Sequence, residues 1–446
     1  MMTVSFLLLT GICGANPLPA LANAIPMRVS GGWVLEVGPG SVSTGERPIT
    51  LPEGQRLEVP PPQPVSVRDE EYAGLPTFKA DAAGWAKGAR LRRLITEECS
   101  ATGLLDLTSV RVKLQRGDAP PLVQGRDYDI DAFWATFGRA DGGAIAPEGA
   151  VFVDYDYTPS RLDNILVTPE GKVRLDVGAP TVGAIVPRDP KPGEVVIARV
   201  FLYGPQEGLT DEDVFPVDFG LAPSTGTSVA ESLLPKTFAK LRAGEPVTIV
   251  AWGDSVTAGA NVKDPSAWYQ HRFAALLKER FPSAEVTMLT AAWPGSGSEG
   301  YLRAPAGSEH EFVRDVLDPK PDLVTIEFVN DAYLDEEATQ THYAMILERL
   351  QSIGAEVVLI APHLVRPDWM NVPTLKFDED PRPYVKGLRR FASERHIALA
   401  DASREWCRLW RMGIPYTTLL LNSINHPDER GHEIFAQALI RLFPER

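Results

Sequence analysis

The chain has 446 residues, 44% of which are hydrophobic, and its formal net charge at pH 7 is −15. This length and composition predict two domains, each large enough to bury a sizeable core. The negative charge argues against nucleic acid or an anionic membrane surface as a partner, because both are themselves negatively charged. No stretch beyond the N-terminus approaches the ~20 apolar residues of a membrane-spanning helix.

The N-terminus has the pattern of an export signal. An apolar run covers 4–13 and is followed by Ala-Asn-Ala at 22–24. This arrangement predicts a signal peptide over 1–24, so we expect a secreted or periplasmic protein. The mature chain then keeps two cysteines, Cys99 and Cys407, which are either isolated buried thiols or an interdomain disulfide.

Residues 25–221 are rich in short runs that alternate apolar and polar side chains, with frequent Pro and Gly between them. Period-2 alternation is typical of β-strands. The strand candidates are 110–114, 151–157, 165–168, 173–177 and 195–203. We interpret this part as a β-sandwich-like accessory domain that contains one helix near 81–98.

The pattern changes after a small, polar linker, predicted over 222–235. Residues 236–446 alternate apolar strand candidates with amphipathic helix candidates. The strands are predicted at 246–251, 285–290, 322–328, 355–360 and 397–401. The helices are predicted at 266–281, 309–317, 336–353, 382–395 and 429–443. Five such alternations predict a parallel sheet covered on both faces, whose working site lies beyond the carboxyl ends of the strands.

The first of these strands runs directly into a polar turn. Residues 253–259 read Gly-Asp-Ser-Val-Thr-Ala-Gly, with Ser255 at the apex. A serine in this position can present its hydroxyl and its own backbone N–H to one point, as an acyl-transfer nucleophile requires. The motif differs from the Gly-x-Ser-x-Gly elbow because Thr257 occupies the final glycine position.

Three further polar residues occur where the topology would bring them to the same edge. Gly295, with Gly297 as the alternative, follows the second strand, and Asn330 follows the third. His426 precedes the last helix. Each of these residues alone would suit an ordinary turn or helix start. Together with Ser255 they are informative, because each lies after a strand or before a helix that would bring it to the same edge of the sheet.

This order of serine, glycine, asparagine and histidine resembles the SGNH, or GDSL, hydrolases, a family of serine esterases and lipases, over residues 240–446. The resemblance implies a three-layer α/β/α, flavodoxin-like domain in which Ser255 is the nucleophile and His426 the base. The N–H groups of Ser255 and Gly295 and the side chain of Asn330 would form the oxyanion hole. No cofactor or metal is implied. The chain also resembles secreted family members that carry a β-rich N-terminal domain, and such proteins often remove acetyl groups from polysaccharides. The resemblance therefore implies a carbohydrate acetylesterase with an acetylated polysaccharide or oligosaccharide as substrate.

One position departs from the family pattern. The family usually places an aspartate three residues before the histidine, and this chain has Ser423 there. A carboxylate at this point orients the imidazole and stabilises its protonated form. Three replacements remain open: a backbone carbonyl, help from Ser423 or Asn422, or a carboxylate from elsewhere. Glu327 and Asp331 lie nearest among the motifs.

Aromatic residues cluster around the motifs. Trp293 and Trp369, which lie in loops rich in Pro and Gly, are candidates for a substrate wall, together with His363 after a strand. Core packing is the better interpretation of three others, namely Trp252, Trp268 and Trp406.

Two other classes of function stay open. The chain could hydrolyse short-chain lipid esters or thioesters, or it could be a catalytically inactive carbohydrate-binding protein. A metal site formed by His426, Asp428 and His432 is disfavoured, because Asp428 suits a helix N-cap and His432 falls inside the last helix. The sequence contains no indication of the oligomeric state.

Overall fold

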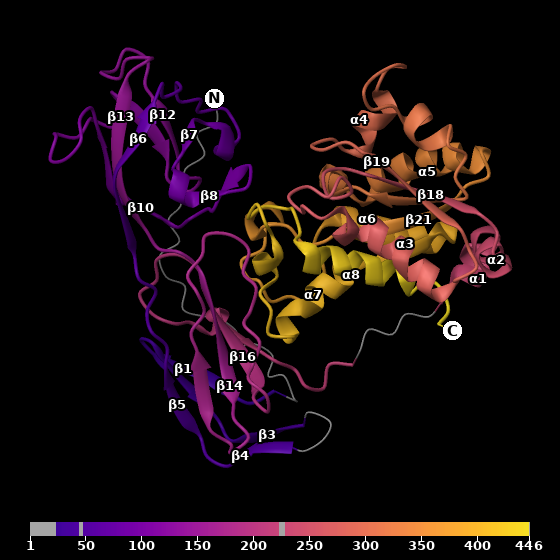
Figure 1. The fold of residues 1–446 in the computed structure, drawn as a ribbon, viewed down its shortest axis with the longest axis horizontal. Coiled ribbons are helices and arrows are strands. Elements are labelled where there is room, and N and C mark those ends of the chain that lie inside the picture. Colours follow the sequence, from indigo (N-terminus) through magenta and orange to yellow (C-terminus); the bar gives the residue numbers. More distant parts are fainter. Residues whose placement is uncertain (1–23, 44–47, 223–227, 446) are drawn as a thin grey trace.

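The computed structural model describes residues 24–43, 48–222 and 228–445. A tall β-rich region lies beside an α/β domain, and the two are in contact (Figure 1). The predicted signal peptide lies outside the described residues except for Ala24. Among the described residues, no helix is long and apolar enough to cross a bilayer.

One part of the β-rich region is built on a central antiparallel sheet with the strand order β10-β13-β6. A smaller sheet, β11-β12-β7, shares its core, where Val112, Val153 and Phe137 are fully buried. A short hairpin, β8-β9, extends from this part toward the α/β domain (Figure 1). The strands are β6 (Val65–Ala73), β7 (Ala89–Arg90), β8 (Ile95–Thr96), β9 (Cys99–Ser100), β10 (Leu105–Lys113), β11 (Tyr128–Asp131), β12 (Thr136–Arg139) and β13 (Ala150–Tyr157).

The other part of the region has a separate core. The sheets β1-β2-β5 and β15-β14-β16-β17 bury Leu35, Ile165 and Ile197 between them, as a sandwich does. The antiparallel, β-rich prediction is therefore confirmed, with two cores in place of one. The strands are β1 (Met27–Gly31), β2 (Val34–Val37), β3 (Gly40–Ser43), β4 (Pro48–Leu51), β5 (Gln55–Glu58), β14 (Arg161–Val167), β15 (Val173–Asp176), β16 (Val195–Leu202) and β17 (Val214–Pro216).

One sequence-based expectation for this region is wrong. The helix expected at 81–98 is replaced by 3₁₀ turns at Gly84–Ala86 and Arg92–Leu94 and by the strands β7 and β8. A Cβ on Gly88 would lie 2.2 Å from the carbonyl oxygen of Phe137, so this segment packs against β12 as extended chain. Of the two alternatives left open for the cysteines, the structure has the first, since Cys99 and Cys407 are free, buried thiols.

The α/β domain contains the predicted parallel sheet, with the strand order β19-β18-β20-β21-β22. This is the flavodoxin-like order 2-1-3-4-5, whose switch point lies between β18 and β20. The strands are β18 (Val247–Gly253), β19 (Val286–Ala292), β20 (Leu323–Glu327), β21 (Glu356–Ala361) and β22 (Ala398–Asp401). The helices are α1 (Ala230–Leu233), α2 (Pro235–Ala243), α3 (Tyr269–Arg280), α4 (Ser298–Arg303), α5 (Glu336–Ser352), α6 (Pro383–Arg395), α7 (Ala402–Arg408) and α8 (Glu429–Ile440).

Helices cover both faces of this sheet. Alternate residues of β18 face opposite cores: Ile249 packs with α3, α7 and α8, and Val250 packs with α5 and α6. Four of the five predicted helices are present, and the fifth, at 309–317, is a short π-helical turn over Val313–Leu317. The polar motifs identified in the sequence all follow strands of this sheet or precede α8, so they meet at one edge.

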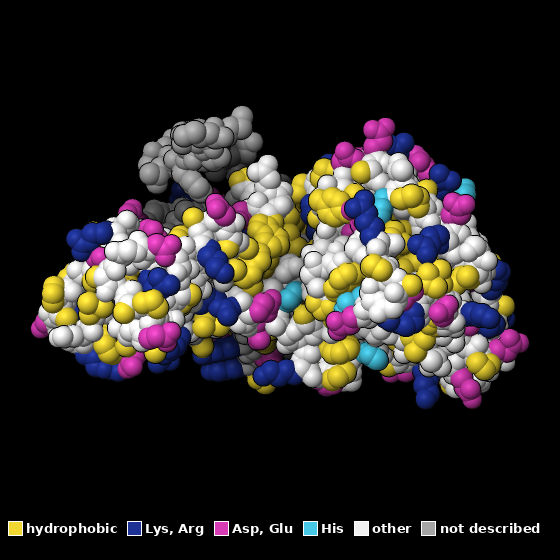
Figure 2. Space-filling model, turned by 90° about the horizontal axis from the view of Figure 1, so that it is seen from above, with side chains coloured by type: hydrophobic (Ala, Val, Ile, Leu, Met, Phe, Trp, Pro, Cys, Tyr) yellow, Lys and Arg dark blue, Asp and Glu magenta, His cyan; other side chains and the backbone are white. Residues whose placement is uncertain are grey.

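The two halves share an extensive interface. Trp410 of the α/β domain packs into a small core contributed by β14, β16 and β17. The guanidinium of Arg366 lies over the ring of Trp134, 4.4 Å from its centroid. Hydrophobic side chains gather along the boundary between the halves in Figure 2.

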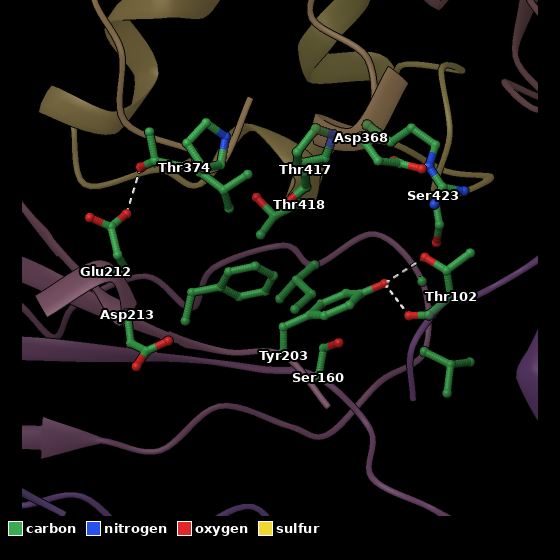
Figure 3. Close-up of a pocket in the computed structure, with 18 of the residues that line it drawn as sticks. Thr102, Ser160, Tyr203, Glu212, Asp213, Asp368, Thr374, Thr417, Thr418 and Ser423 are labelled. Carbon is green, nitrogen blue, oxygen red and sulfur yellow. Dashed lines mark hydrogen bonds and ion pairs between the residues drawn. The ribbon is translucent and has the colours of Figure 1, made fainter. Parts of the chain in front are cut away.

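A cavity of about 390 Å³ remains within this interface. Tyr203 and Ser160 of the β-rich region face Thr417 and Thr418 of the α/β domain across it (Figure 3). The cavity reaches Ser423, so it lies behind the loop that carries His426.

Candidate active site

The nucleophile candidate Ser255 occupies the turn that follows β18. Gly253 allows this turn, because a Cβ there would lie 2.0 Å from Thr257 Oγ1 and 2.3 Å from the carbonyl oxygen of Glu327. Ser255 is 4% exposed, and its Oγ lies 3.0 Å from Nε2 of His426. No acceptor in the described part of the chain receives the backbone N–H of Ser255, which leaves this donor free for a substrate oxygen.

Asn330 is held beside the serine by a buried carboxylate. Asp254 accepts the backbone N–H of Val256 at 3.0 Å and that of Asn330 at 2.9 Å. One side chain thus joins the turn after β18 to the turn after β20, across the switch point of the sheet. This link fixes the asparagine relative to the nucleophile.

The loop after β19 completes this edge. The Asn330 amide donates to the carbonyl of Ser296 at 3.3 Å, and the backbone of Gly297 lies against Asn330 and Asp331. Gly295 has a left-handed backbone with φ of 78° and open space around it. Neither glycine N–H donates to an acceptor among the described residues, so the choice between Gly295 and Gly297 as the third oxyanion donor stays a prediction.

His426 is placed by a tightly bonded loop. The Oδ1 atom of Asn422 accepts the backbone N–H groups of Ile424, Asn425 and His426 at 2.9–3.0 Å. His363 also contacts this loop, because its Nε2 lies 2.7 Å from the carbonyl oxygen of Asn425. His363 is fully buried, so its predicted place in a substrate wall is wrong.

The Nδ1 atom of His426 faces a carboxylate that the sequence did not reveal. Oε1 of Glu98, in the β-rich region, lies 3.1 Å from Nδ1. Asn422 donates to the same oxygen at 2.8 Å, and Asn261 donates to Oε2 at 2.9 Å. Glu327 and Asp331 point elsewhere, toward Thr257 and Ser298 respectively. The residue at the usual acid position, Ser423, contacts Thr96 and not the imidazole.

The comparison with known families agrees with this geometry. Residues 251–434 match the GDSL-like Lipase/Acylhydrolase family. The α/β domain is a GDSL-like acylhydrolase domain. The match begins within β18 and ends within α8, and so includes the serine turn, the glycine loop, the asparagine turn and the histidine loop.

Solved structures show weaker similarities. A two-domain esterase (CEX) active on acetylated mannans, co-crystallised with mannopentaose, is 22% identical with a TM-score of 0.38, over 48% of this chain and 53% of that one. The chain therefore spans about half of that esterase. The acetyl xylan esterase AlAXEase is 20% identical, with a TM-score of 0.34, over 43% of this chain and 98% of its own. Axe2, an acetylxylan esterase from Geobacillus stearothermophilus, is 16% identical with a TM-score of 0.35, over 45% and 97%. No curated protein matches the chain significantly.

Three carboxyl groups are buried behind the serine of the GDSL domain. Burial raises the pKa of Asp254 to about 7, although the two N–H groups that it accepts oppose this. Burial and the neighbouring Asp254 raise the pKa of Glu327 well above its usual range, and burial raises that of Asp331. Such a cluster favours shared protons over three full charges.

These shifts predict a pH-dependent stability. An acid whose pKa rises on folding, here from 3.8 to about 7, stabilises the native state fully below about pH 4. That stabilisation is lost as the pH rises to about 7. We therefore expect the free energy of unfolding of the wild type, minus that of Asp254→Asn, to fall between pH 4 and 7. Urea unfolding at several pH values measures this difference, and a difference that stays constant or rises with pH would contradict the assignment.

The aromatic candidates of the GDSL domain separate into two groups. Trp369 is 48% exposed and lines a cavity of about 530 Å³ together with Asn330 and Asn425. Its ring lies 6.0 Å from that of Trp85 in the β-rich region. Trp293 instead packs against Tyr301 and stacks on His310. The cavity beside Asn330 is therefore lined by one exposed indole, that of Trp369, next to which the β-rich region places Trp85.

His432, which lies within the last helix, has a structural role. His432 is fully buried and accepts the backbone N–H of Tyr269 at 3.1 Å, and burial lowers its pKa to about 3. Asp428 caps α8, as the sequence predicted. Trp252 and Trp406 are buried in the cores, also as predicted. Within the described ranges, no three or more His, Cys, Asp or Glu side chains are arranged so that they could hold a metal ion.

Proposed function

We propose that the protein is a serine esterase that removes acetyl groups from a polysaccharide or oligosaccharide. The observation that carries this proposal is the 3.0 Å contact between Ser255 Oγ and His426 Nε2, beside an asparagine and free backbone N–H groups, within a GDSL-like acylhydrolase domain. These are the parts that acyl transfer through a covalent intermediate requires.

The proposed reaction has two halves. Ser255 Oγ attacks the ester carbonyl while Nε2 of His426 takes its proton. The resulting oxyanion accepts hydrogen bonds from the N–H of Ser255, the amide of Asn330 and a glycine N–H of the 295–297 loop. His426 then gives this proton to the departing sugar oxygen, which leaves as a hydroxyl group, and an acetyl-enzyme remains. Water, activated by the same imidazole, attacks this ester and releases acetate.

Two observations support a carbohydrate as the leaving group. The cavity that contains Asn330 is lined by an exposed indole, Trp369, and Trp85 lies close to that ring. Flat aromatic faces suit the apolar faces of sugar rings. The amide groups of Asn330, Asn371 and Asn425 also line this cavity and can bond to sugar hydroxyls. We further propose export of the protein, based on the N-terminal pattern at 1–24.

The test is acetate release by the wild type and by Ser255→Ala. The substrates are an aryl acetate, acetylated mannan, acetylated xylan and a medium-chain aryl ester; an acyl-thioester serves as the comparison. We expect the wild type to release acetate from the aryl ester and from at least one polymer, and the variant to release none. Preference for the medium-chain ester or the thioester would replace the carbohydrate assignment. Failure to release an acyl group from any of them would refute the esterase proposal.

A further inference from the structure

We propose that Glu98 of the β-rich region is the residue that positions the catalytic histidine, so that the catalytic unit extends across both halves of the chain. This inference rests on the proposed function, since it concerns how His426 works as a base. It assigns to the β-rich region a part in the chemistry itself, beyond any contact with a polymer.

The hydrogen-bonding partners of the two ring nitrogens of His426 support this role. In the neutral ring one nitrogen donates and the other accepts. For Nε2 to take the Ser255 proton it must be the acceptor, so Nδ1 carries the hydrogen. The two groups facing Nδ1 are Oε1 of Glu98, at 3.1 Å, and Oδ1 of Asn261, and both are acceptors. The surroundings of Nδ1 therefore select the tautomer that the reaction needs.

The amide of Asn261 is itself fixed by the same carboxylate. Its Nδ2 donates to Oε2 of Glu98 at 2.9 Å, which directs Oδ1 toward the imidazole. Asn261 has a left-handed backbone, with φ of 67°, which asparagine tolerates better than most residues. Asn422 donates to Oε1 of Glu98 at 2.8 Å. Glu98 is thus the shared acceptor for the base and for the two asparagines beside it.

The charge of Glu98 suits the protonated intermediate. Partial burial opposes ionisation, but hydrogen bonds from His426 and Asn422 outweigh it and lower the pKa of Glu98 to about 2. The carboxylate therefore stays charged across the working pH range. When His426 takes the serine proton, the imidazolium faces an anion. The Glu98 side chain is 46% exposed, so solvent screens part of this attraction.

The hairpin that carries Glu98 is held against the histidine loop. Glu98 lies between β8 and β9, and Thr96 of β8 contacts Ser423 at 3.5 Å. Cys99 of β9 packs with Trp134 and with Ile424, two residues before the histidine. These contacts place the carboxylate by packing on both sides, as a positioning group requires.

The experiment compares Glu98→Gln and Glu98→Asp with a matched control, Glu212→Gln. Glu212 is also a carboxylate of the β-rich region that bonds to the α/β domain, through Thr374, but it does not contact His426. For Glu98→Gln we expect kcat on an aryl acetate to fall by about 10²- to 10⁴-fold, with KM and Tm close to wild type. Glu98→Asp should recover part of kcat, and Glu212→Gln should match wild type.

The pH–rate profile distinguishes two roles of Glu98, namely positioning the imidazole of His426 and merely stabilising the interface between the two halves. Loss of the carboxylate removes the partner of the imidazolium, so the acidic limb of kcat/KM in Glu98→Gln should move to lower pH. The other titratable groups near the ring, namely Asp254, His363, His432 and Glu97, are unchanged in this variant. An interface defect alone would lower activity at every pH without moving this limb.

The outcomes of the comparison are distinct. If wild type is active, Ser255→Ala is inactive and Glu98→Gln keeps kcat within about threefold, the role of Glu98 is overturned while the esterase stands. If wild type shows no hydrolysis that depends on Ser255, the proposed function itself fails. If Glu98→Gln does not fold, Glu98→Ala decides, because this side chain is 46% exposed and its truncation also removes the carboxylate. A kcat within about threefold of wild type at unchanged Tm would overturn the inference, and a strongly reduced kcat at unchanged Tm supports it.

Discussion

Substitution of Ser255 by alanine is expected to lower kcat for ester hydrolysis by about 10⁴- to 10⁶-fold. The side chain is buried at the end of β18, and its Oγ is the atom that hydrogen bonds to the base at 3.0 Å. Without this oxygen no acyl-enzyme can form, and only the oxyanion donors remain to assist attack by water. Initial rates of aryl acetate hydrolysis measure the loss.

A matched control comes from the surface of the same domain. Ser352 lies exposed at the end of α5, and Ser352→Ala should keep wild-type rates. Another residue would have to be the nucleophile if Ser255→Ala kept an activity within tenfold of wild type while Ser352→Ala was unchanged.

Substitution of His426 by glutamine is expected to have an effect of similar size, about 10⁴- to 10⁶-fold on kcat, because a neutral amide cannot take the serine proton. The fold should persist, since the loop is held by Asn422 through backbone N–H groups that the substitution leaves in place. Hydrolysis rates together with Tm separate the chemical effect from a structural one.

The control for this variant is His396→Asn, at the exposed, left-handed C-cap of α6, where asparagine is well tolerated. It should behave as wild type. A His426→Gln protein that is as stable as wild type and retains more than a tenth of its kcat would show that His426 is not the base.

Local patterns in the sequence were enough to predict the α/β half. Period-3.6 helices and apolar strands gave the parallel sheet, and the rule that sites lie beyond the carboxyl ends of such strands grouped Ser255, Asn330 and the glycine loop. The contact between Ser255 and His426 follows from these placements, although the residues are 171 positions apart.

Glu98 could not be found in this way, because its role depends on how two separately folded regions dock. Asn422, its partner in the histidine loop, is 324 positions away, and the surrounding sequence contains no motif. The segment 79–87 is rich in Ala and Lys, which favour a helix, so the chain around Glu98 was assigned the wrong local structure. Pairing of β7 with β12 and packing against the α/β domain overrode that preference. The one indication in the sequence was the missing aspartate at position 423, which left a carboxylate from elsewhere as one of three possible replacements.

The error at His363 has a similar origin. A histidine directly after a strand is equally compatible with a cleft and with a buried support, and nothing in the neighbouring sequence distinguishes the two. In the structure the ring packs on Trp406 and Phe435 and bonds to the carbonyl of Asn425. Burial lowers the pKa of His363 well below its ordinary value, which suits a neutral structural donor.

The most direct test of the account is covalent labelling of the intact protein with a fluorophosphonate, followed by peptide mass spectrometry. The arrangement of Ser255, His426 and the oxyanion donors predicts a single adduct on Ser255, formed much more slowly in Glu98→Gln than in wild type. An adduct on a different residue, or no adduct on a folded protein that hydrolyses esters, would contradict a serine mechanism at this site.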